Sequence, residues 1–230
     1  MNDLITHPGL PLAHLIRPSQ RSDCTSAPCL LLLHGVGANE RSLATIAAQI
    51  DPRFTVILVR SPVQFGPMQF GFFRVNFTAA GPQIDPVQAE QSRQLLARFI
   101  EALPHVYGID PKQVWIAGFS QGGILSASLA LTRPELVRGF GILSGRILPE
   151  IAPQIADVQQ LADLTAFVSH GIHDDKLTVD FARSARTLLT TRRIALTYME
   201  YNAGHELQPS MVGDFHQWLQ HGLDQASAGT

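Results

Sequence analysis

The sequence predicts a single α/β domain in which a mainly parallel sheet of about seven strands is flanked by helices. The length of 230 residues fits one large domain. Short apolar runs alternate with longer helical patterns, and this alternation is typical of parallel sheets. No repeat, low-complexity tract or linker divides the chain. We therefore expect one domain over residues 1–230, with residues 1–11 and 223–230 loosely ordered.

Seven segments are predicted to be strands. The first alternates loosely between apolar and polar residues, which indicates an edge strand. The others are largely continuous apolar runs, as expected of strands that are buried on both faces. The seven segments are residues 12–18, 29–35, 54–62, 113–120, 137–145, 164–171 and 194–202.

Helices are predicted between these strands by apolar residues that recur on one face. The clearest helix opens at Asp85 and Pro86, a capping residue followed by proline at the first helical position. Its apolar face carries Leu95, Leu96, Phe99, Ile100 and Leu103. Two further helices are predicted over residues 180–189 and around Met211, Phe215, Trp218 and Leu219. In such folds, sites form beyond the carboxyl ends of the strands, so the loops there are the places to look for chemistry.

Composition narrows the class of partner and the compartment. The net charge of −2 gives no electrostatic reason to expect nucleic acid or an acidic membrane surface. No apolar run has the length of a membrane span, so no stable membrane insertion is expected. The first residues lack a signal-peptide pattern, and Cys24 and Cys29 do not form a disulfide framework. A reduced, cytoplasmic protein is the expected setting.

One serine stands between two glycines where a predicted strand meets a predicted helix. Gly118-Phe119-Ser120-Gln121-Gly122 matches the nucleophile-elbow pattern, in which a sharp turn presents the serine at a helix N-terminus. Side chains at positions 118 and 122 would clash in such a turn. The alternative is an ordinary tight turn that carries an ordinary serine.

A serine hydroxyl needs a general base, and the base needs an orienting carboxylate. Asp174 and Asp175 follow the strand predicted over residues 164–171, and His205 follows the last predicted strand. The order serine, acid, histidine is the one expected for this pattern. The adjacent aspartates leave the choice of acid open. A metal site that combines them with His170 and His173 lacks a matching distant set of ligands, so no metal or cofactor is expected.

Acyl transfer also needs two N–H donors for the developing oxyanion. The N–H of Gln121, directly after the serine, is one candidate. Val36 supplies the other, in the loop His34-Gly35-Val36-Gly37 after a buried strand. His34 is expected to stabilise this turn rather than to act as a base.

A long segment, residues 61–83, contains five of the twelve phenylalanines and has little regular periodicity. A loop of this length in a compact domain is usually functional or mobile. Two interpretations are compatible: an apolar cluster that packs over the sheet, or the wall of an apolar substrate groove. The second makes Phe65, Phe70, Phe72 and Phe73 candidate substrate-binding residues.

Four motifs together give the chain a family resemblance: "LLHGVGANE", "GFSQGG", "HGIHDD" and "YNAGHEL". The sequence resembles the carboxylesterase/phospholipase family of α/β-hydrolases, which includes the acyl-protein thioesterases. Ala38-Asn39-Glu40 in the first motif is closer to the bacterial esterases of the family. The resemblance implies that Ser120 is the nucleophile, His205 the base and Asp174 the acid.

The expected function is that of a serine hydrolase that cleaves short- to medium-chain carboxylic esters or thioesters through an acyl-enzyme. The alternatives are a lysophospholipase, an acyl-protein thioesterase and a non-catalytic binding protein on the same fold. The expected partner is a small-molecule ester, and a homodimer is compatible with the sequence. Residues 144–166 are too few for a large lid domain.

Overall fold

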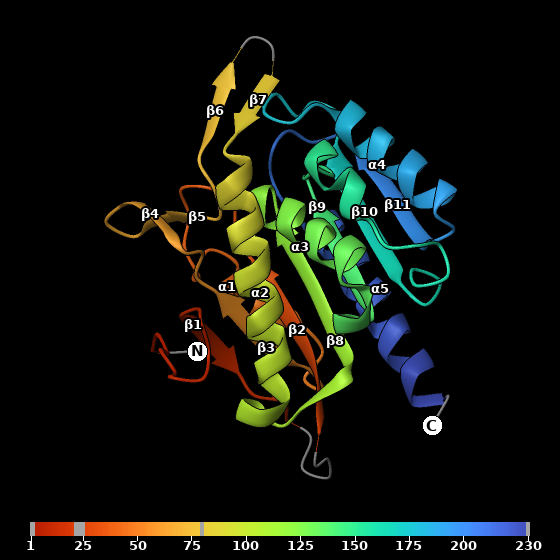
Figure 1. The fold of residues 1–230 in the computed structure, drawn as a ribbon. Coiled ribbons are helices and arrows are strands. Elements are labelled where there is room, and N and C mark those ends of the chain that lie inside the picture. Colours follow the sequence, from red (N-terminus) through yellow and green to blue (C-terminus); the bar gives the residue numbers. More distant parts are fainter. Residues whose placement is uncertain (1–2, 21–25, 79–80, 229–230) are drawn as a thin grey trace.

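The computed structural model describes residues 3–20, 26–78 and 81–228. Within these ranges, seven strands form one sheet in the order β1-β3-β2-β8-β9-β10-β11 (Figure 1). The predicted single α/β domain with about seven strands is confirmed. The strands are β1 His14–Arg17, β2 Ala27–Leu33, β3 Thr55–Val59, β8 Ile109–Phe119, β9 Gly139–Leu143, β10 Thr165–Gly171 and β11 Ala195–Tyr201.

The strands of this sheet run parallel except β1, which pairs with β3 in the antiparallel sense at one edge. The register brings the carboxyl ends together. Leu33 of β2 lies opposite Gly118 of β8, and Phe119 lies opposite Leu143 of β9. Leu143 in turn lies opposite Ser169 of β10. The loops that follow these four strands therefore meet at one edge of the sheet.

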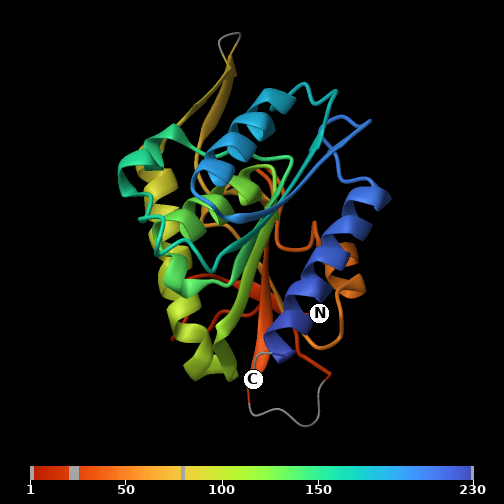
Figure 2. The ribbon, with the colours of Figure 1, turned by 90° about the vertical axis from the view of Figure 1, so that its right-hand side faces the viewer.

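Helices cover both faces of the sheet. Figure 2 shows α2, α3 and α4 on one side and α1 and α5 on the other. The helices are α1 Ala44–Gln49, α2 Pro86–Tyr107, α3 Gln121–Thr132, α4 Val179–Thr191 and α5 Pro209–Ala228, with short 3₁₀ helices η1 Pro134–Leu136 and η2 Pro149–Gln154.

Each face of the sheet has its own core, and β2 contributes to both. Leu31 and Leu33 are buried in the cluster that includes Phe99 of α2. Leu30 and Leu32 are buried in the other cluster, with Phe215 of α5. Successive side chains of a strand point to opposite faces, so a strand covered on both sides needs an unbroken apolar run. This explains why continuous apolar runs predicted the strands.

Helix α2 begins and ends as local signals require. The Asp85 side chain accepts hydrogen bonds from the N–H groups of Val87 and Gln88, at 3.1 and 3.0 Å. These bonds satisfy donors that have no partner inside the helix. Gly108 ends the helix in the left-handed conformation, with φ of 63°. On the predicted apolar face, Leu95 is half-buried, while Leu96, Phe99, Ile100 and Leu103 are buried.

The phenylalanine-rich segment differs from the expected irregular loop. It forms two antiparallel hairpins, β4 Val63–Gly66 with β5 Gln69–Gly71 and β6 Val75–Thr78 with β7 Gly81–Ile84. Figure 1 shows both hairpins outside the large sheet. Strands of three or four residues are too short to produce a recognisable alternating pattern, so the sequence did not reveal them.

The two ends of the described chain pack more closely than the sequence predicts. Leu10 is buried, and Ile5 pairs with His14 of β1. At the other end, Leu223 is fully buried within α5. Cys29 is a buried free thiol, whereas Cys24 lies outside the described residues.

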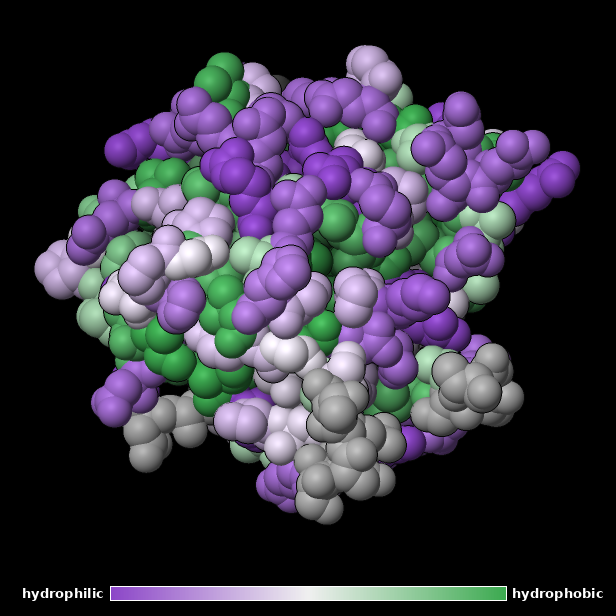
Figure 3. Space-filling model, turned by 60° about the horizontal axis from the view of Figure 1, so that its bottom comes forward, coloured by the Kyte–Doolittle hydropathy of each residue, from purple (hydrophilic) through white to green (hydrophobic). Residues whose placement is uncertain are grey.

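Figure 3 views the end of the molecule where the parallel strands begin, away from the meeting loops. Hydrophilic and hydrophobic residues are interspersed over this face. Within residues 3–20, 26–78 and 81–228, no helix has both the length and the apolar character that crossing a membrane requires.

Candidate active site

Ser120 lies in a sharp turn between β8 and α3. Its φ of 54° and ψ of −116° are rarely adopted by a residue other than glycine. A Cβ at Gly118 would lie 2.4 Å from the carbonyl carbon of Gly122, and a Cβ at Gly122 would lie 2.0 Å from the Leu33 oxygen. Only glycine fits at either position. The strained turn holds the serine side chain at the N-terminus of α3.

Ser120, His205 and Asp174 form one hydrogen-bonded series. Nε2 of His205 lies 2.9 Å from Oγ of Ser120, and Nδ1 of His205 lies 2.6 Å from Oδ2 of Asp174. The three residues follow β8, β10 and β11, whose carboxyl ends lie at the same edge of the sheet. A histidine that donates through Nδ1 to a carboxylate can accept the hydroxyl proton at Nε2. The arrangement can therefore activate the serine for nucleophilic attack.

Asp174 is buried and fully occupied by donors. Its Oδ1 accepts the N–H groups of Lys176 and Leu177, at 2.9 and 2.8 Å. Its Oδ2 faces Nε2 of His170 at 3.2 Å, in addition to His205. Burial alone would raise the pKa of Asp174. Hydrogen bonds from His170, His205 and the two backbone N–H groups outweigh burial and hold its pKa well below the usual range. The carboxylate stays ionised at neutral pH.

Asp175 is placed differently from its neighbour. It is exposed, and its recorded contact is an ion pair of 3.4 Å with the ammonium of Lys176. His173 is also exposed and bonds Oδ1 of Asn202 at 2.8 Å. His170, by contrast, is fully buried and bonds the Leu177 carbonyl at 2.7 Å. The structure thus brings Asp174, and not Asp175, to His205. In the described residues, no group of three or more His, Cys, Asp or Glu side chains could hold a metal ion.

The two candidate oxyanion donors lie beside Ser120. Val36 and Gln121 both line a narrow cavity that contains Ser120. Among the described residues, neither the N–H of Val36 nor that of Gln121 has a hydrogen-bond partner. Adjacent groups are occupied: the N–H of Gly37 donates to the Phe70 carbonyl at 2.8 Å, and that of Ala38 donates to Gly35. Two unpaired donors at this position suit a developing negative charge.

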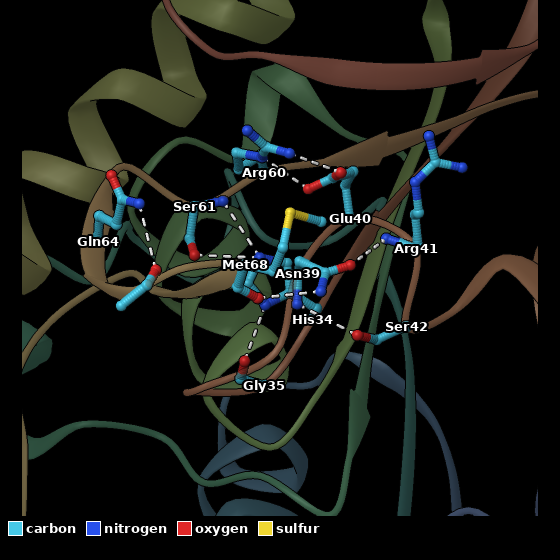
Figure 4. Close-up of polar contacts among 11 residues, drawn as sticks. His34, Gly35, Asn39, Glu40, Arg41, Ser42, Arg60, Ser61, Gln64 and Met68 are labelled. Carbon is cyan, nitrogen blue, oxygen red and sulfur yellow. Dashed lines mark hydrogen bonds and ion pairs between the residues drawn. The ribbon is translucent and has the colours of Figure 1, made fainter. Parts of the chain in front are cut away.

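The side chain of His34 anchors the loop that carries Val36 (Figure 4). Nδ1 of His34 bonds the Gly35 carbonyl at 2.8 Å, and its Nε2 accepts the N–H of Ser61 at 3.2 Å. Burial lowers the pKa of His34, so the ring is neutral. His34 therefore stabilises the turn, as the sequence predicts.

An ion pair adds a second anchor to the same loop. The guanidinium of Arg60 binds both carboxylate oxygens of the buried Glu40, at 2.7 and 2.8 Å (Figure 4). The same guanidinium lies 4.5 Å from the centre of the Phe70 ring. Side-chain amide Nδ2 of Asn39 donates to the Met68 carbonyl at 3.0 Å. The hairpin β4–β5 thus braces the loop from which Val36 projects.

The side chain of Gln121 makes a contact that the sequence did not suggest. Its Oε1 accepts the N–H of Phe72 at 2.6 Å, and its Nε2 donates to the Phe73 carbonyl at 2.7 Å. Hydroxyl Oγ of Ser92 in α2 also donates to the Phe72 carbonyl. The "GFSQGG" motif therefore ties the phenylalanine-rich segment to the start of α3.

The cleft at Ser120 is formed mostly by residues that the sequence analysis did not predict. An open cavity of about 500 Å³ contains Ser120 and His205, and its apolar wall consists largely of Leu43, Phe77, Phe119 and Leu207. Of these, Phe77 comes from the exposed hairpin β6–β7 and is 52% exposed. No motif or pattern in the sequence indicates Leu43 or Leu207 as part of the site, since both lie far from Ser120 along the chain.

Of the four phenylalanines expected in a substrate groove, one, Phe73, lines a cavity at Ser120. Phe72 is fully buried and lies 5.8 Å from the His34 ring, so it belongs to the core. Phe70 is buried under Arg60, and Phe65 lies under the guanidinium of Arg74, 5.5 Å away. None of these three lines either cavity at Ser120. Phe73 lines the narrow one, although it is 1% exposed.

Comparisons with known proteins cover most of the chain. The sequence model of the family described as Phospholipase/Carboxylesterase matches residues 19–223. The Bacillus subtilis (strain 168) protein MhqD is 24% identical over 199 residues, which cover 86% of this chain and 96% of MhqD.

A fungal relative and a solved structure extend the comparison. Acyl-protein thioesterase 1 of Aspergillus fumigatus is 30% identical over 131 residues, 53% of this chain and 54% of that relative. The match therefore spans about half of the fungal protein. The crystal structure of the Bacillus cereus carboxylesterase superposes with a TM-score of 0.80 at 25% identity, covering 92% of this chain and 94% of that one.

Proposed function

The chain belongs to the phospholipase/carboxylesterase family of ester hydrolases, and we propose that it cleaves short- to medium-chain carboxylic esters through an acyl-enzyme on Ser120. One observation carries the proposal. A single imidazole, that of His205, lies within hydrogen-bond distance of Ser120 Oγ on one side and of the ionised Asp174 on the other. This geometry supplies a base where the nucleophile needs one.

The reaction follows from these contacts in two halves. In the first, Nε2 of His205 takes the hydroxyl proton while Oγ of Ser120 bonds to the ester carbonyl carbon. The N–H groups of Val36 and Gln121 donate to the oxyanion that forms. The C–O bond to the alcohol then breaks, and the alcohol leaves with the proton from Nε2.

In the second half, water takes the place of the alcohol. Its proton passes to His205 as its oxygen bonds to the acyl carbon. The bond from that carbon to Ser120 Oγ breaks, and Oγ regains a proton from Nε2. Asp174 accepts from Nδ1 throughout and stabilises the imidazolium that forms in each half. The products are one acid and one alcohol, and no cofactor takes part.

A thioester is the second candidate substrate. The 30% identity to acyl-protein thioesterase 1 of Aspergillus fumigatus favours it. The open cleft, in which the leaving group would lie beside His205, also has room for a bulky thiol. Rates on matched oxygen and sulfur esters of one acyl group decide between the two substrate classes. A lysophospholipase activity is tested in the same series with a lysophospholipid.

The proposal is tested by the Ser120→Ala variant and by covalent labelling. We expect Ser120→Ala to lose about 10³-fold or more in turnover, as when one member of such a triad is removed. A fluorophosphonate should label the wild-type chain on the peptide that contains Ser120. Ser210→Ala, an exposed serine at the start of α5, is the matched control and should keep both properties. Label on another peptide, or full activity in Ser120→Ala, would reject the proposal and favour a binding protein.

Two further expectations from the sequence remain predictions. A cytoplasmic location is supported by the buried free thiol of Cys29, which has no disulfide partner in the described part of the chain. A homodimer is tested by sedimentation of the full chain.

A further inference from the structure

Arg146 is a buried cation that has no matching anion in the part of the chain that the structure describes. It follows β9 in the loop next to the turn that holds Ser120, and it is 8% exposed. Its Nε has no hydrogen-bond partner in the described residues, and its Nη2 makes one long bond of 3.5 Å to the Pro82 carbonyl. Its guanidinium also lies 5.0 Å from the centre of the Phe181 ring. These contacts use little of its capacity for hydrogen bonds.

Two other shielded arginines of this chain are paired with carboxylates. Arg60 binds both oxygens of Glu40, and Arg93 binds both oxygens of Glu90. The carboxylate of Glu150 acts on Arg146 only at a distance, and no ion pair within 4.0 Å joins Arg146 to any described carboxylate. Burying an unpaired charge is costly, so a charge kept in this state calls for a partner from outside the chain.

Arg146 lines the narrow cavity at the nucleophile. This cavity contains Ser120, Gln121, Val36 and Arg146, and its walls include Phe73 and Phe77. Its volume is about 20 Å³, against about 500 Å³ for the open cavity, so a group that enters it must be slender. The open cavity of about 500 Å³ shares Ser120 and Val36 with it but contains His205, which the narrow cavity does not.

This difference between the cavities indicates where the alcohol part and the acyl part of an ester lie. His205 must protonate the leaving group, so the alcohol lies in the open cavity beside its imidazole. The carbonyl oxygen faces Val36 and Gln121, which line the narrow cavity, so the acyl chain bonded to the same carbon enters this cavity. The acyl chain therefore runs from Ser120 toward Arg146.

We propose that the preferred acyl group is short and ends in a carboxylate, which Arg146 binds, so that the substrates are half-esters of short dicarboxylic acids. This assignment rests on the proposed ester hydrolysis and names its acyl specificity. A planar guanidinium matches a carboxylate in geometry and charge, and the low-polarity walls strengthen the pair. A neutral acyl chain of the same length would leave the buried cation unpaired.

The test compares two esters that differ in one charge. Monobenzyl succinate and benzyl methyl succinate can both lose benzyl alcohol from nearly the same acyl chain, and the initial release of benzyl alcohol is the reaction measured. We expect kcat/KM of the wild-type enzyme to favour the charged ester by about tenfold or more, since hydrogen bonds to charged groups contribute this much. Arg146→Met should lower this ratio about 10- to 100-fold, and Arg146→Lys should retain part of the preference because it keeps the charge.

Two control variants locate the effect. Arg186→Met removes an exposed arginine that lies 4.8 Å from the centre of the Tyr198 ring, and it should leave the ratio unchanged. Lys176→Met removes a cation that lines the open cavity, which Arg146 does not line. Loss of the preference in Lys176→Met rather than in Arg146→Met would overturn the assignment. An equal loss on both esters in Arg146→Met would also overturn it and make Arg146 a structural residue.

A binding measurement separates this inference from the proposed function. Saturation-transfer NMR of succinate and butyrate needs no turnover and works with the wild-type chain and both Arg146 variants. Preferential binding of succinate that Arg146→Met abolishes supports the anion site even if neither benzyl ester is cleaved. Cleavage of benzyl methyl succinate without any preference for succinate rejects the anion site and leaves the hydrolase intact.

Discussion

Gln121 holds Phe72 by the backbone: the N–H of Phe72 donates to Oε1 of Gln121 at 2.6 Å. The other end of the same amide donates to the Phe73 carbonyl. The residue whose own N–H faces the proposed oxyanion thus also fixes the segment that forms the wall of the narrow cavity. One side chain therefore links the turn at Ser120 to the wall of the narrow cavity.

Gln121→Ala should destabilise the protein and slow it. The change leaves the N–H of Phe72 and the Phe73 carbonyl buried without their partner, at a cost of about 2–4 kcal/mol in the free energy of unfolding. Urea denaturation measures this loss, and ester kinetics should reveal a fall in kcat. Gln64→Ala, an exposed glutamine of β4, is the control and should change neither. Equal stability of Gln121→Ala and the wild-type protein would contradict the anchoring role.

The adjacent aspartates should respond differently to the same substitution. Asp174→Asn removes the charge that orients His205, and a fall of about 10³- to 10⁴-fold in kcat is expected. Asp175→Asn changes an exposed side chain whose recorded partner is Lys176, and kcat should stay within a few-fold of the wild type. Steady-state kinetics on one ester compares the two variants. A large loss in Asp175→Asn alone would move the role of acid by one residue.

Replacing two phenylalanines of the hairpin segment with alanine should affect different properties, stability in one case and substrate binding in the other. Phe72→Ala empties a fully buried position and should cost about 3–5 kcal/mol of stability. Phe77→Ala removes a half-exposed ring from the open cavity, so stability should change little. Its effect should appear instead as a higher KM for esters with an apolar alcohol, such as benzyl rather than methyl esters. If Phe77→Ala leaves the ratio of these KM values unchanged, the ring is not part of the wall.

Stability should decline as the pH falls from 7 to 5. Burial lowers the pKa of His14, His34 and His216 in the folded protein. Between these lowered values and the ordinary pKa of about 6.5, the unfolded chain binds more protons than the folded one. The contribution of these neutral histidines to the free energy of unfolding is therefore fully present above about pH 6.5. It is lost as the pH drops below that value, by up to about 1.4 kcal/mol per pH unit for each histidine.

Chemical denaturation at several pH values checks this decline. His14 is a convenient probe because it lies away from Ser120, between the Leu12 carbonyl and the Tyr107 hydroxyl. His14→Gln keeps a polar side chain there but does not titrate, so its stability should fall less steeply than that of the wild type. Stability that stays constant from pH 7 to pH 5 would refute the prediction.

The sequence could predict the sheet because its strands are buried on both faces. Leu30, Leu31, Leu32 and Leu33 pack alternately into two cores, and this leaves an unbroken apolar run that can be recognised. The turn at Ser120 could be predicted because two close backbone approaches require glycine at 118 and 122. Strong local constraints leave strong local signals.

The walls of the site could not be predicted, because no local rule governs them. Phe72 and Phe77 are chemically identical and five positions apart, yet one is core and the other lines the cleft. Their burial is decided by where two short hairpins pack. Arg146 likewise lies in a loop without a motif, and its lack of a carboxylate partner among the described residues becomes visible only when the surrounding side chains are placed.

The two hairpins occupy a single stretch between β3 and α2, and their described residues form no ladder with the large sheet. The stretch should therefore be exchangeable without changes to the large sheet, on two conditions. The new segment must supply the two backbone partners of the Gln121 side chain, and it must keep the contacts of hairpin β4–β5 with the loop that carries Val36. A chimera carrying the corresponding stretch of another family member would inherit that donor's cleft wall on this protein's catalytic frame. Changes confined to this stretch leave the strands of the large sheet and the turn at Ser120 as they are, so it is a suitable segment to randomise in directed evolution of acyl and alcohol specificity.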